Sequence, residues 1–194
     1  PAGTGGAASR TADRRPRLAD NRAMPHTPDT IGTLRDVLTR CRTLAVVGLS
    51  PQWHRPSYFA AKYMQAHGYR VVPVNPLVAK AGGTILGERA YASVREADAA
   101  MRAEGGRTDM VDCFRKTEDI PPLAQEAIAI GARCLWLQLG VANDAATDLA
   151  EAAGLQVIQN RCVKIEHARL FGGLGWAGVD RRVISAKRPQ VLPY

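Results

Sequence analysis

The sequence lacks the features that mark a membrane-spanning, metal-binding or disulfide-bonded protein. No stretch approaches the roughly 18 uncharged apolar residues that a membrane-spanning helix needs, and the first residues contain no apolar segment of the signal-peptide type. The four cysteines form no CxxC pair, and no histidine stands at metal-ligand spacing from them. We therefore expect free thiols, a cytoplasmic location, no membrane contact and no bound metal.

A basic stripe is also missing from the middle of the chain, although the net charge is +8. Residues 1–23 and 171–194 each carry +3, which leaves only +2 for residues 24–170. Nucleic-acid binding usually needs basic residues gathered on one face, so we do not expect nucleic acid as a partner. Residues 1–23 are rich in Gly, Ala and Arg without apolar periodicity. They predict a disordered leader or tag, and residues 172–194 predict a basic tail.

Between these ends, short apolar runs alternate with amphipathic segments. We expect strands at residues 44–47, 69–74, 109–114, 133–139 and 155–158, helices at 30–40, 56–67, 93–101, 120–130 and 143–153, and short pieces at 85–86 and 165–171. Strands that are apolar throughout are typical of a parallel sheet covered on both faces. Residues 24–171 therefore predict a single α/β domain with a Rossmann-like, doubly wound parallel sheet.

The first strand leads into a loop that is suited to phosphate. Gly48, Leu49 and Ser50 follow the strand, and a proline opens the next helix. Glycine permits a close backbone approach, and the N–H groups at a helix start attract anions. Ser50 can donate a hydroxyl and Arg55 two N–H groups to phosphate oxygens. The loop predicts a site for a phosphorylated ligand; the alternative is that Ser57 only caps the helix and Arg55 is solvated.

The second strand ends without the signature of a dinucleotide site. Sites for NAD usually carry GxGxxG after the first strand and Asp or Glu after the second. This chain has a single glycine in the first loop, and Asn75-Pro76 after the second strand. Both departures argue against NAD as the ligand. For Asn75-Pro76, the alternative to a role in ligand binding is a simple turn.

Three later segments bring further groups to the same predicted edge of the sheet. Phe114 and Arg115 follow the third strand, where they either meet a ligand or belong to the core and to solvent. Gln138 ends the fourth strand. Cys162 lies beside Arg161 and Lys164, and neighbouring cations lower the pKa of a thiol. We nevertheless expect a buried or edge-packed thiol at this position, with the lowered pKa as the alternative.

Six ordered segments then resemble a known family: AVVGLSP (45–51), RPSYFAAKYM (55–64), GYRVVPVNP (68–76), VDCFRK (111–116), WLQLGV (136–141) and NRCVKIEH (160–167). The chain resembles the small bacterial CoA-binding proteins, which are stand-alone relatives of the CoA-binding domain of the succinyl-CoA synthetase α subunit. The resemblance spans about residues 33–171. Residues 80–85 and 95–108 are longer than the family pattern.

The resemblance implies a Rossmann fold that holds coenzyme A or an acyl-CoA. The implied ligand contacts are Gly48, Leu49, Ser50, Arg55 and Ser57 around the phosphates, Asn75 and Pro76 near the adenosine, Phe114 and Arg115 across the cleft, and Gln138, Gly140, Asn160 and Cys162 as further family positions.

The resemblance does not bring the synthetase reaction with it. That reaction needs a phosphorylatable histidine in a second domain and a nucleotide-binding partner. We therefore expect a non-catalytic sensor or carrier module without catalytic residues. Two alternatives stay open: an enzyme on the same scaffold that processes acyl-CoA or uses NAD(P), and a CoA-binding subunit of a separate synthetase.

Overall fold

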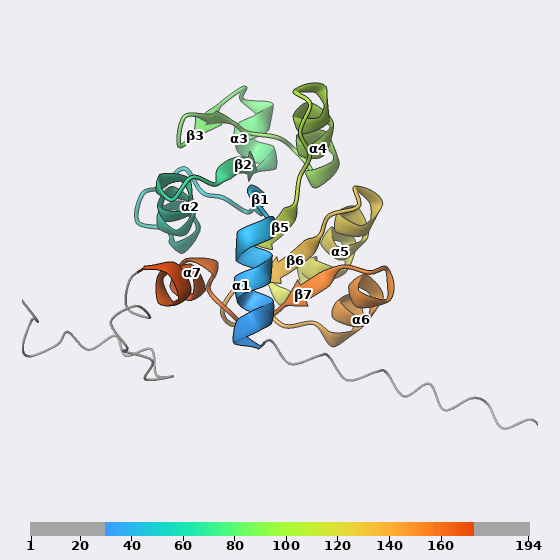
Figure 1. Ribbon diagram of the computed structural model, residues 1–194. Helices are drawn as coiled ribbons and strands as arrows, with labels where there is room; N and C mark the ends of the chain where they lie inside the picture. The colour runs from blue at the N-terminus through green and yellow to red at the C-terminus, as the bar shows by residue number, and fades with distance from the viewer. Residues whose placement is uncertain (1–29, 173–194) are drawn as a thin grey trace, which may run out of the picture.

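The computed structural model describes residues 30–172. The expected leader and all but the first residue of the expected basic tail lie outside these residues. The described part is an α/β domain in which helices cover both faces of a central sheet (Figure 1). No helix within it is long and apolar enough to cross a membrane.

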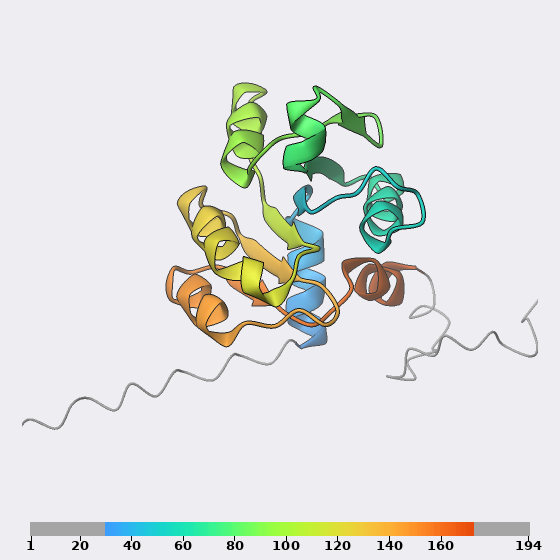
Figure 2. The same ribbon diagram turned by 180° about the vertical axis from the view of Figure 1, so that it is seen from behind.

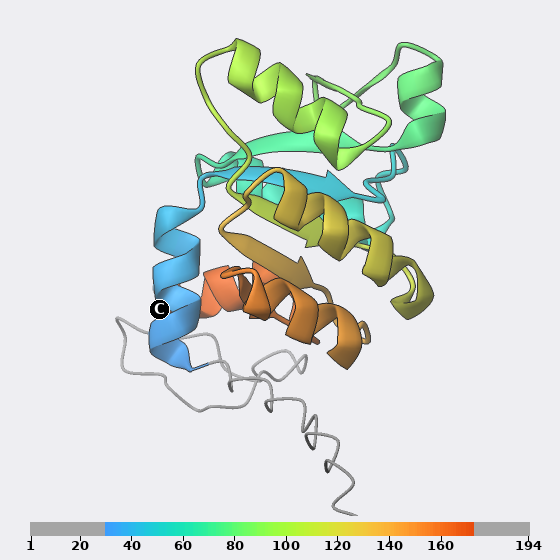
Figure 3. The same ribbon diagram turned by 90° about the vertical axis from the view of Figure 1, so that its right-hand side faces the viewer.

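The central sheet is parallel and has five strands in the order β2-β1-β5-β6-β7. The strands are β1 (Thr43–Val47), β2 (Arg70–Val74), β5 (Met110–Cys113), β6 (Cys134–Leu137) and β7 (Gln156–Ile158). The arrows point the same way in the side view (Figure 3). The chain passes from β1 to β2 on one side and then returns to place β5 on the other side of β1. Ligands of such doubly wound sheets bind at this switch point, outside the carboxyl ends of the strands.

Three helices cover each face of the sheet (Figures 1 and 2). One layer consists of α1 (Ile31–Arg40), α2 (Pro56–Ala66) and α7 (Val163–Phe171), and the other of α4 (Val94–Ala103), α5 (Ile120–Ala129) and α6 (Asp144–Ala152). Successive strand residues alternate between the two cores, as the pleat requires. Val46 and Trp136 face α1, α2 and α7, whereas Ala45 and Leu135 face the other layer. The predicted fold is confirmed, with strand and helix ends within a few residues of the expected ones.

The segment after β2 differs from the sequence expectation. Instead of a simple turn, Asn75 caps a short helix α3 (Pro76–Lys80) by accepting hydrogen bonds from two backbone N–H groups. A small hairpin follows, with β3 (Thr84–Ile85) and β4 (Glu88–Arg89). Its turn residues Leu86 and Gly87 both have positive φ angles, of 57° and 81°, as a two-residue hairpin turn requires. Leu86 therefore lies in the turn rather than in the expected strand piece.

Candidate functional site

A cleft of about 610 Å³ opens at the carboxyl end of the sheet, over the switch point between β1 and β5. It is lined by Gly48, Ser50, Pro51, Gln52, Arg55, Pro56, Ser57, Asn75, Leu77, Val78, Phe114, Arg115, Gln138, Leu139 and Val141. A second cavity of about 550 Å³ shares Gly48, Ser50, Asn75, Leu77 and Arg115 with the first. The two cavities therefore adjoin, and the second extends toward the N-terminal ends of α4 and α5.

Gly48 allows the β1–α2 loop to pack directly on the end of β5. Its φ angle is +80°, and a Cβ atom at this position would lie 2.6 Å from the carbonyl oxygen of Phe114. Its N–H donates to the carbonyl of Val74, so the loop is also tied to β2. Glycine is therefore required by close contact within the protein as well as by its backbone conformation.

The rest of the β1–α2 loop is held by its own side chains. The N–H of Ser50 donates to Oγ of Ser57 at 3.1 Å, and the N–H of Gln52 donates to Oγ of Ser50 at 3.2 Å. Nε of Arg55 donates to Oε1 of Gln52. Ser57 does not cap α2, because Arg55 is the residue at the N-cap position. The loop is therefore preformed. In the first turn of α2, Pro56 has no N–H and the N–H of Tyr58 donates to the carbonyl of Arg55, so the N–H of Ser57 is the one without a carbonyl partner inside the helix.

Asn75 joins the β1–α2 loop to α3 with both ends of its amide. Its Nδ2 donates to the carbonyl of Leu49 at 2.9 Å, while Oδ1 accepts from the N–H groups of Leu77 and Val78. An aspartate could accept these two bonds but could not donate the first. The side chain at this position is thus engaged within the protein, unlike the carboxylate that holds a ribose in dinucleotide sites.

Arg115 separates the two cavities and lines both. Asp119 orients its guanidinium, with Nε and Nη2 at 3.0 and 2.8 Å from Oδ2. Phe114 is half-buried: it packs on the α1/α2/α7 core and also lines the first cavity. Phe114 therefore belongs to the core and also faces the cleft, and its contact with a ligand stays a prediction.

Gln138, which lines the cleft, forms a hydrogen bond with a buried carboxyl group. Gln138 follows β6, is 5% exposed, and donates from Nε2 to Oδ1 of Asp112 at 2.6 Å. Asp112 lies within β5 and is 2% exposed. Burial raises the pKa of Asp112 to about 7, against a smaller lowering by the hydrogen bond from Gln138.

Four predicted site residues lie outside the linings of these two cavities. Leu49 is fully buried in the core. Gly140 and Asn160 bind each other, because the N–H of Gly140 donates to Oδ1 of Asn160. Cys162 precedes α7, and burial raises the pKa of its thiol despite the lowering by Lys164 and by two backbone N–H groups. The raised pKa agrees with the expected buried thiol, and the alternative, a lowered pKa of Cys162, is wrong.

The other predicted residues do meet, and the structure adds some that the sequence reasoning missed. Gly48, Ser50, Arg55, Ser57, Asn75, Phe114, Arg115 and Gln138 line the first cavity, and Pro76 lines the second. Asp112 was missed, although a lone carboxylate in an otherwise apolar strand is itself a signal. Leu77 and Leu139 carried no signal, because exposed leucines are common on protein surfaces. Within residues 30–172, no group of three His, Cys, Asp or Glu side chains could hold a metal ion.

The fold and the cleft define a class of protein: a single α/β domain with its ligand site at the switch point of a doubly wound parallel sheet. Within that class, residues 42–168 match the CoA binding domain family, and the chain belongs to this family.

Proteins from other organisms support the assignment. The chain is 36% identical over 135 residues to the uncharacterized protein YneT of Bacillus subtilis (strain 168). The aligned residues cover 70% of this chain and 92% of YneT. Among solved structures, it is similar to a hypothetical protein from Pyrococcus horikoshii OT3, with a TM-score of 0.66 and 35% identity over 74% of this chain and 94% of that one. It is also similar to Prb, the PH1109 protein redesigned for binding, with a TM-score of 0.68 and 33% identity over 76% of this chain and 96% of that one.

Proposed function

We propose that the chain binds coenzyme A or an acyl-CoA in the cleft at the switch point. The observation that carries the proposal is the preformed β1–α2 loop at the start of an 11-residue helix, with Arg55 and Arg115 facing the same cavity. A helix N-terminus and two guanidinium groups together favour a diphosphate. Membership of the CoA binding domain family supports coenzyme A as the source of that diphosphate.

The charge and polarity of the two cavities suggest how the rest of the ligand lies. The second cavity includes Glu118 and Glu126, which repel phosphate but can accept hydrogen bonds from hydroxyl and amino groups. We place the adenine base there, beside Asn75 and Pro76, and the 3′-phosphate on the ribose of CoA outside this cavity. The opposite end of the first cavity is bordered by Leu139 and Val141, where the less polar pantetheine arm fits.

We further propose that the chain acts by binding, as a sensor or carrier. The groups that line the cavities bind through charge and hydrogen bonds, and the partly exposed thiol of Cys162 lies outside both linings. Turnover of acetyl-CoA or NADPH would instead favour an enzyme. Co-purification with an ATP-grasp protein would favour a subunit of a separate synthetase.

The first test is calorimetric titration of the purified full chain with CoA, acetyl-CoA and NAD. We expect saturable binding of CoA and no binding of NAD. Comparable heats for CoA and acetyl-CoA would place the acyl group outside the closest contacts. Binding of NAD alone, or of none of the three, would contradict the proposal.

Arg55→Ala tests the phosphate site directly. We expect it to weaken CoA binding by about 1.5–3 kcal/mol, the contribution of a charged hydrogen bond, which is roughly ten- to 150-fold in Kd. Arg40→Ala is the matched control, because Arg40 is an exposed arginine on α1 that pairs with Asp36. An unchanged CoA affinity in a folded Arg55→Ala variant would remove Arg55 from the site.

A further inference from the structure

Asp112 is a buried carboxyl group without a cation. It lies within β5, with Val46 of β1 and Trp136 of β6 as its neighbours in the sheet, and it is 2% exposed. None of the lysine, arginine or histidine side chains in residues 30–172 forms an ion pair with it; its side-chain partner is the amide of Gln138. Burial of an unpaired carboxylate is costly, and an apolar residue would fit the strand at a lower cost. Such a group calls for a reason other than stability.

The charge of Asp112 affects few other ionisable groups. The groups that respond to it are the thiols of Cys113, on the same strand, and Cys162, at the start of α7. Burial and the negative charge of Asp112 both raise the pKa values of these thiols, so they stay neutral. The carboxyl group therefore acts on one polar neighbour, Gln138.

The hydrogen bond to Asp112 fixes the amide of Gln138 in one orientation. A carboxylate can only accept, so it takes the Nε2 end of the amide, at 2.6 Å from Oδ1. The Oε1 end then remains for the cleft that Gln138 lines. An amide without such a partner would present its donor and its acceptor almost equally.

The position of Gln138 relative to the phosphate loop indicates which part of the ligand it meets. β6 is two strands from β1 in the sheet, and neighbouring strands lie about 4.8 Å apart. Gln138 therefore lies about 10 Å from the end of β1, beside Leu139 and Val141. In CoA, the segment at this distance from the diphosphate is the pantetheine arm, whose two amides each carry an N–H donor.

We propose that Gln138 is a specificity-determining residue that accepts a hydrogen bond from an amide N–H of the pantetheine arm, and that Asp112 is the positioning residue that keeps Oε1 of Gln138 toward the ligand. This inference rests on the proposed binding of CoA. It explains why a costly carboxyl group lies beneath an uncharged part of the cleft: the ligand contact is made by Gln138, and Asp112 acts only through it.

The test compares two ligands across three variants. CoA carries the arm, whereas ADP keeps the adenosine and the diphosphate without it. We expect Asp112→Leu and Gln138→Met each to weaken CoA binding about five- to tenfold, as for one lost neutral hydrogen bond, with ADP affinity unchanged. The double variant should lose no more than either single one, because both remove the same contact.

Asp112→Asn is the conservative variant. Its Oδ1 can still accept from Nε2 of Gln138. Both amide groups can also rotate so that Asn donates to Oε1 of Gln138, and the two arrangements have similar energies. CoA then selects the arrangement in which Oε1 faces the cleft. We therefore expect CoA affinity within about twofold of the unaltered chain. A loss as large as that of Asp112→Leu would show that the charge, rather than the orientation of Gln138, is what matters, and would overturn the proposal.

The pH dependence of ligand affinity is a second test, because it would not change if Asp112 had only a structural role. Because the pKa of Asp112 is about 7, acidification converts its carboxylate to an acid that can donate to Oε1 and compete with the ligand. Dephospho-CoA is the probe, since it carries no phosphomonoester that titrates in this range. We expect its affinity to fall by up to about twofold between pH 8 and pH 6, as for the two arrangements open to Asp112→Asn, and to stay level in that variant. Level binding in both proteins would contradict the assignment.

Failure of this inference is distinguishable from failure of the proposed function. If the unaltered chain binds neither CoA nor dephospho-CoA, the proposed function is wrong and the inference falls with it. If CoA binds but the variants lose CoA and ADP equally, Asp112 and Gln138 support the cleft as a whole and the inference alone is wrong. An unchanged CoA affinity in Gln138→Met would have the same meaning.

Discussion

The two ends of β5 carry aspartates that meet their negative charge in opposite ways. Asp109, just before the strand, accepts hydrogen bonds from the N–H groups of Arg42 and Thr43 at 3.0 and 3.2 Å. Two arginines, Arg107 and Arg133, lie within 3.7 Å of its other oxygen. Asp112, near the end of the same strand, has an amide as its side-chain partner. The charge of Asp109, at the amino end of the sheet, is compensated by nearby arginines. The charge of Asp112, at the carboxyl end, has no such partner and lowers the stability of the fold.

This difference separates the end of the sheet where the charge has a structural role from the end that carries the candidate site. Asp109 joins the segment before β1 to the segment before β5, so its carboxylate contributes to stability. Asp112 accepts a hydrogen bond from Gln138, a side chain that lines the cleft. Functional groups are often kept at the expense of stability, and the two aspartates allow that cost to be measured within one strand.

The largest effect is expected at the compensated end. Asp109→Ala removes the acceptor of two backbone N–H groups and the counter-charge of two arginines, so we expect a loss of about 3 kcal/mol in the free energy of unfolding. Urea denaturation measures it. Asp36→Ala is the control, because Asp36 and Arg40 form an exposed pair that contributes about 0.5 kcal/mol or less. Similar losses in the two variants would contradict the structural role of Asp109.

Two glycines allow a second comparison of the carboxyl and amino ends of the sheet. Gly48 at the carboxyl end and Gly68 at the amino end both have φ angles of +80°. Alanine is strained in this conformation at either position, at a cost of about 1 kcal/mol. At Gly68 the nearest atom to a new Cβ is Nη2 of Arg42, at 3.4 Å, whereas at Gly48 it is the Phe114 carbonyl oxygen at 2.6 Å. We therefore expect Gly68→Ala to lose about 1 kcal/mol and Gly48→Ala about 2 kcal/mol.

Binding should separate the two glycine variants more clearly than stability. The clash at Gly48 must move either the β1–α2 loop or the end of β5, and both carry groups that line the cleft. We expect calorimetry to show weakened CoA binding in Gly48→Ala and unchanged binding in Gly68→Ala. Equal affinities would show that the loop tolerates the shift and that its geometry is not critical for the ligand.

Much of the fold could be predicted from local sequence, because the strands are continuous apolar runs and the helices have periodic apolar faces. Thr30, Ser93 and Asn143 cap their helices as polar residues before an apolar pattern usually do. The short helix α3 could not be predicted in this way. It has five residues, none of them fully buried. It depends on Asn75, whose side chain donates a hydrogen bond to the carbonyl of Leu49.

The candidate site could be predicted less completely, because its central contacts join residues far apart in the chain. The loop residues Gly48, Ser50 and Arg55 carry a local signal for phosphate. The pairing of Asp112 with Gln138 depends on the register between β5 and β6, which no local pattern contains. The raised pKa of Cys162 has the same origin, since the buried surroundings outweigh the cations that adjoin it in sequence.

Asp112→Asn measures the cost at the uncompensated end. The pKa of Asp112 is about 7 in the folded chain against 3.8 for an ordinary aspartate, so the folded state binds the proton more tightly. Its contribution to stability is full below about pH 4 and is lost as the pH rises through 7. We expect Asp112→Asn to match the unaltered chain near pH 4 and to exceed it by about 1–2 kcal/mol at pH 8. A lower stability at pH 8 would mean that the carboxylate is compensated after all.

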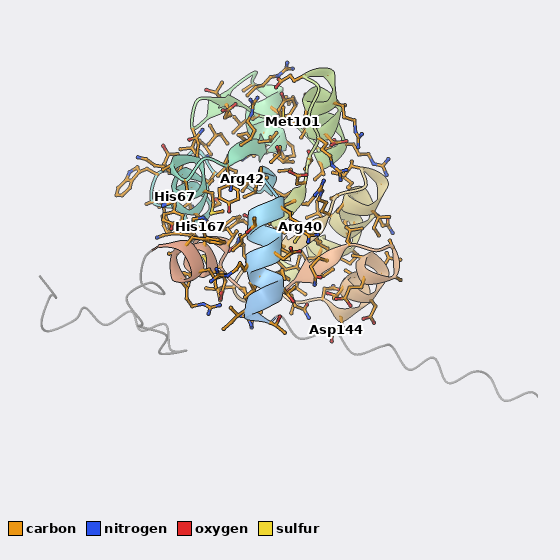
Figure 4. All side chains as sticks on the ribbon, in the orientation of Figure 1. Arg40, Arg42, His67, Met101, Asp144 and His167 are labelled. Carbon is orange, nitrogen blue, oxygen red and sulfur yellow. The ribbon has the colours of Figure 1, made fainter. Side chains whose placement is uncertain are left out.

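The smallest effect comes from a group with the opposite sign. His167 on α7 is buried, with Nδ1 3.2 Å from the hydroxyl of Tyr63. Its ring lies 5.0 Å from that of His67, on the side of the domain that also carries Arg42 (Figure 4). Burial, His67 and Arg42 lower the pKa of His167. Its contribution to stability is therefore present above its ordinary pKa of 6.5 and is lost as the pH falls through the lower folded value.

In the unaltered chain, Asp112 masks this loss, because acidification from pH 8 to pH 5 protonates Asp112 and stabilises the fold while His167 destabilises it. We therefore compare Asp112→Asn with the double variant Asp112→Asn/His167→Gln, in which glutamine can still bond Tyr63 but does not titrate. Urea denaturation between pH 7.5 and pH 5 should show a steeper loss of stability in the single variant. Parallel curves would mean that α7 accommodates a charged His167 without a loss of stability.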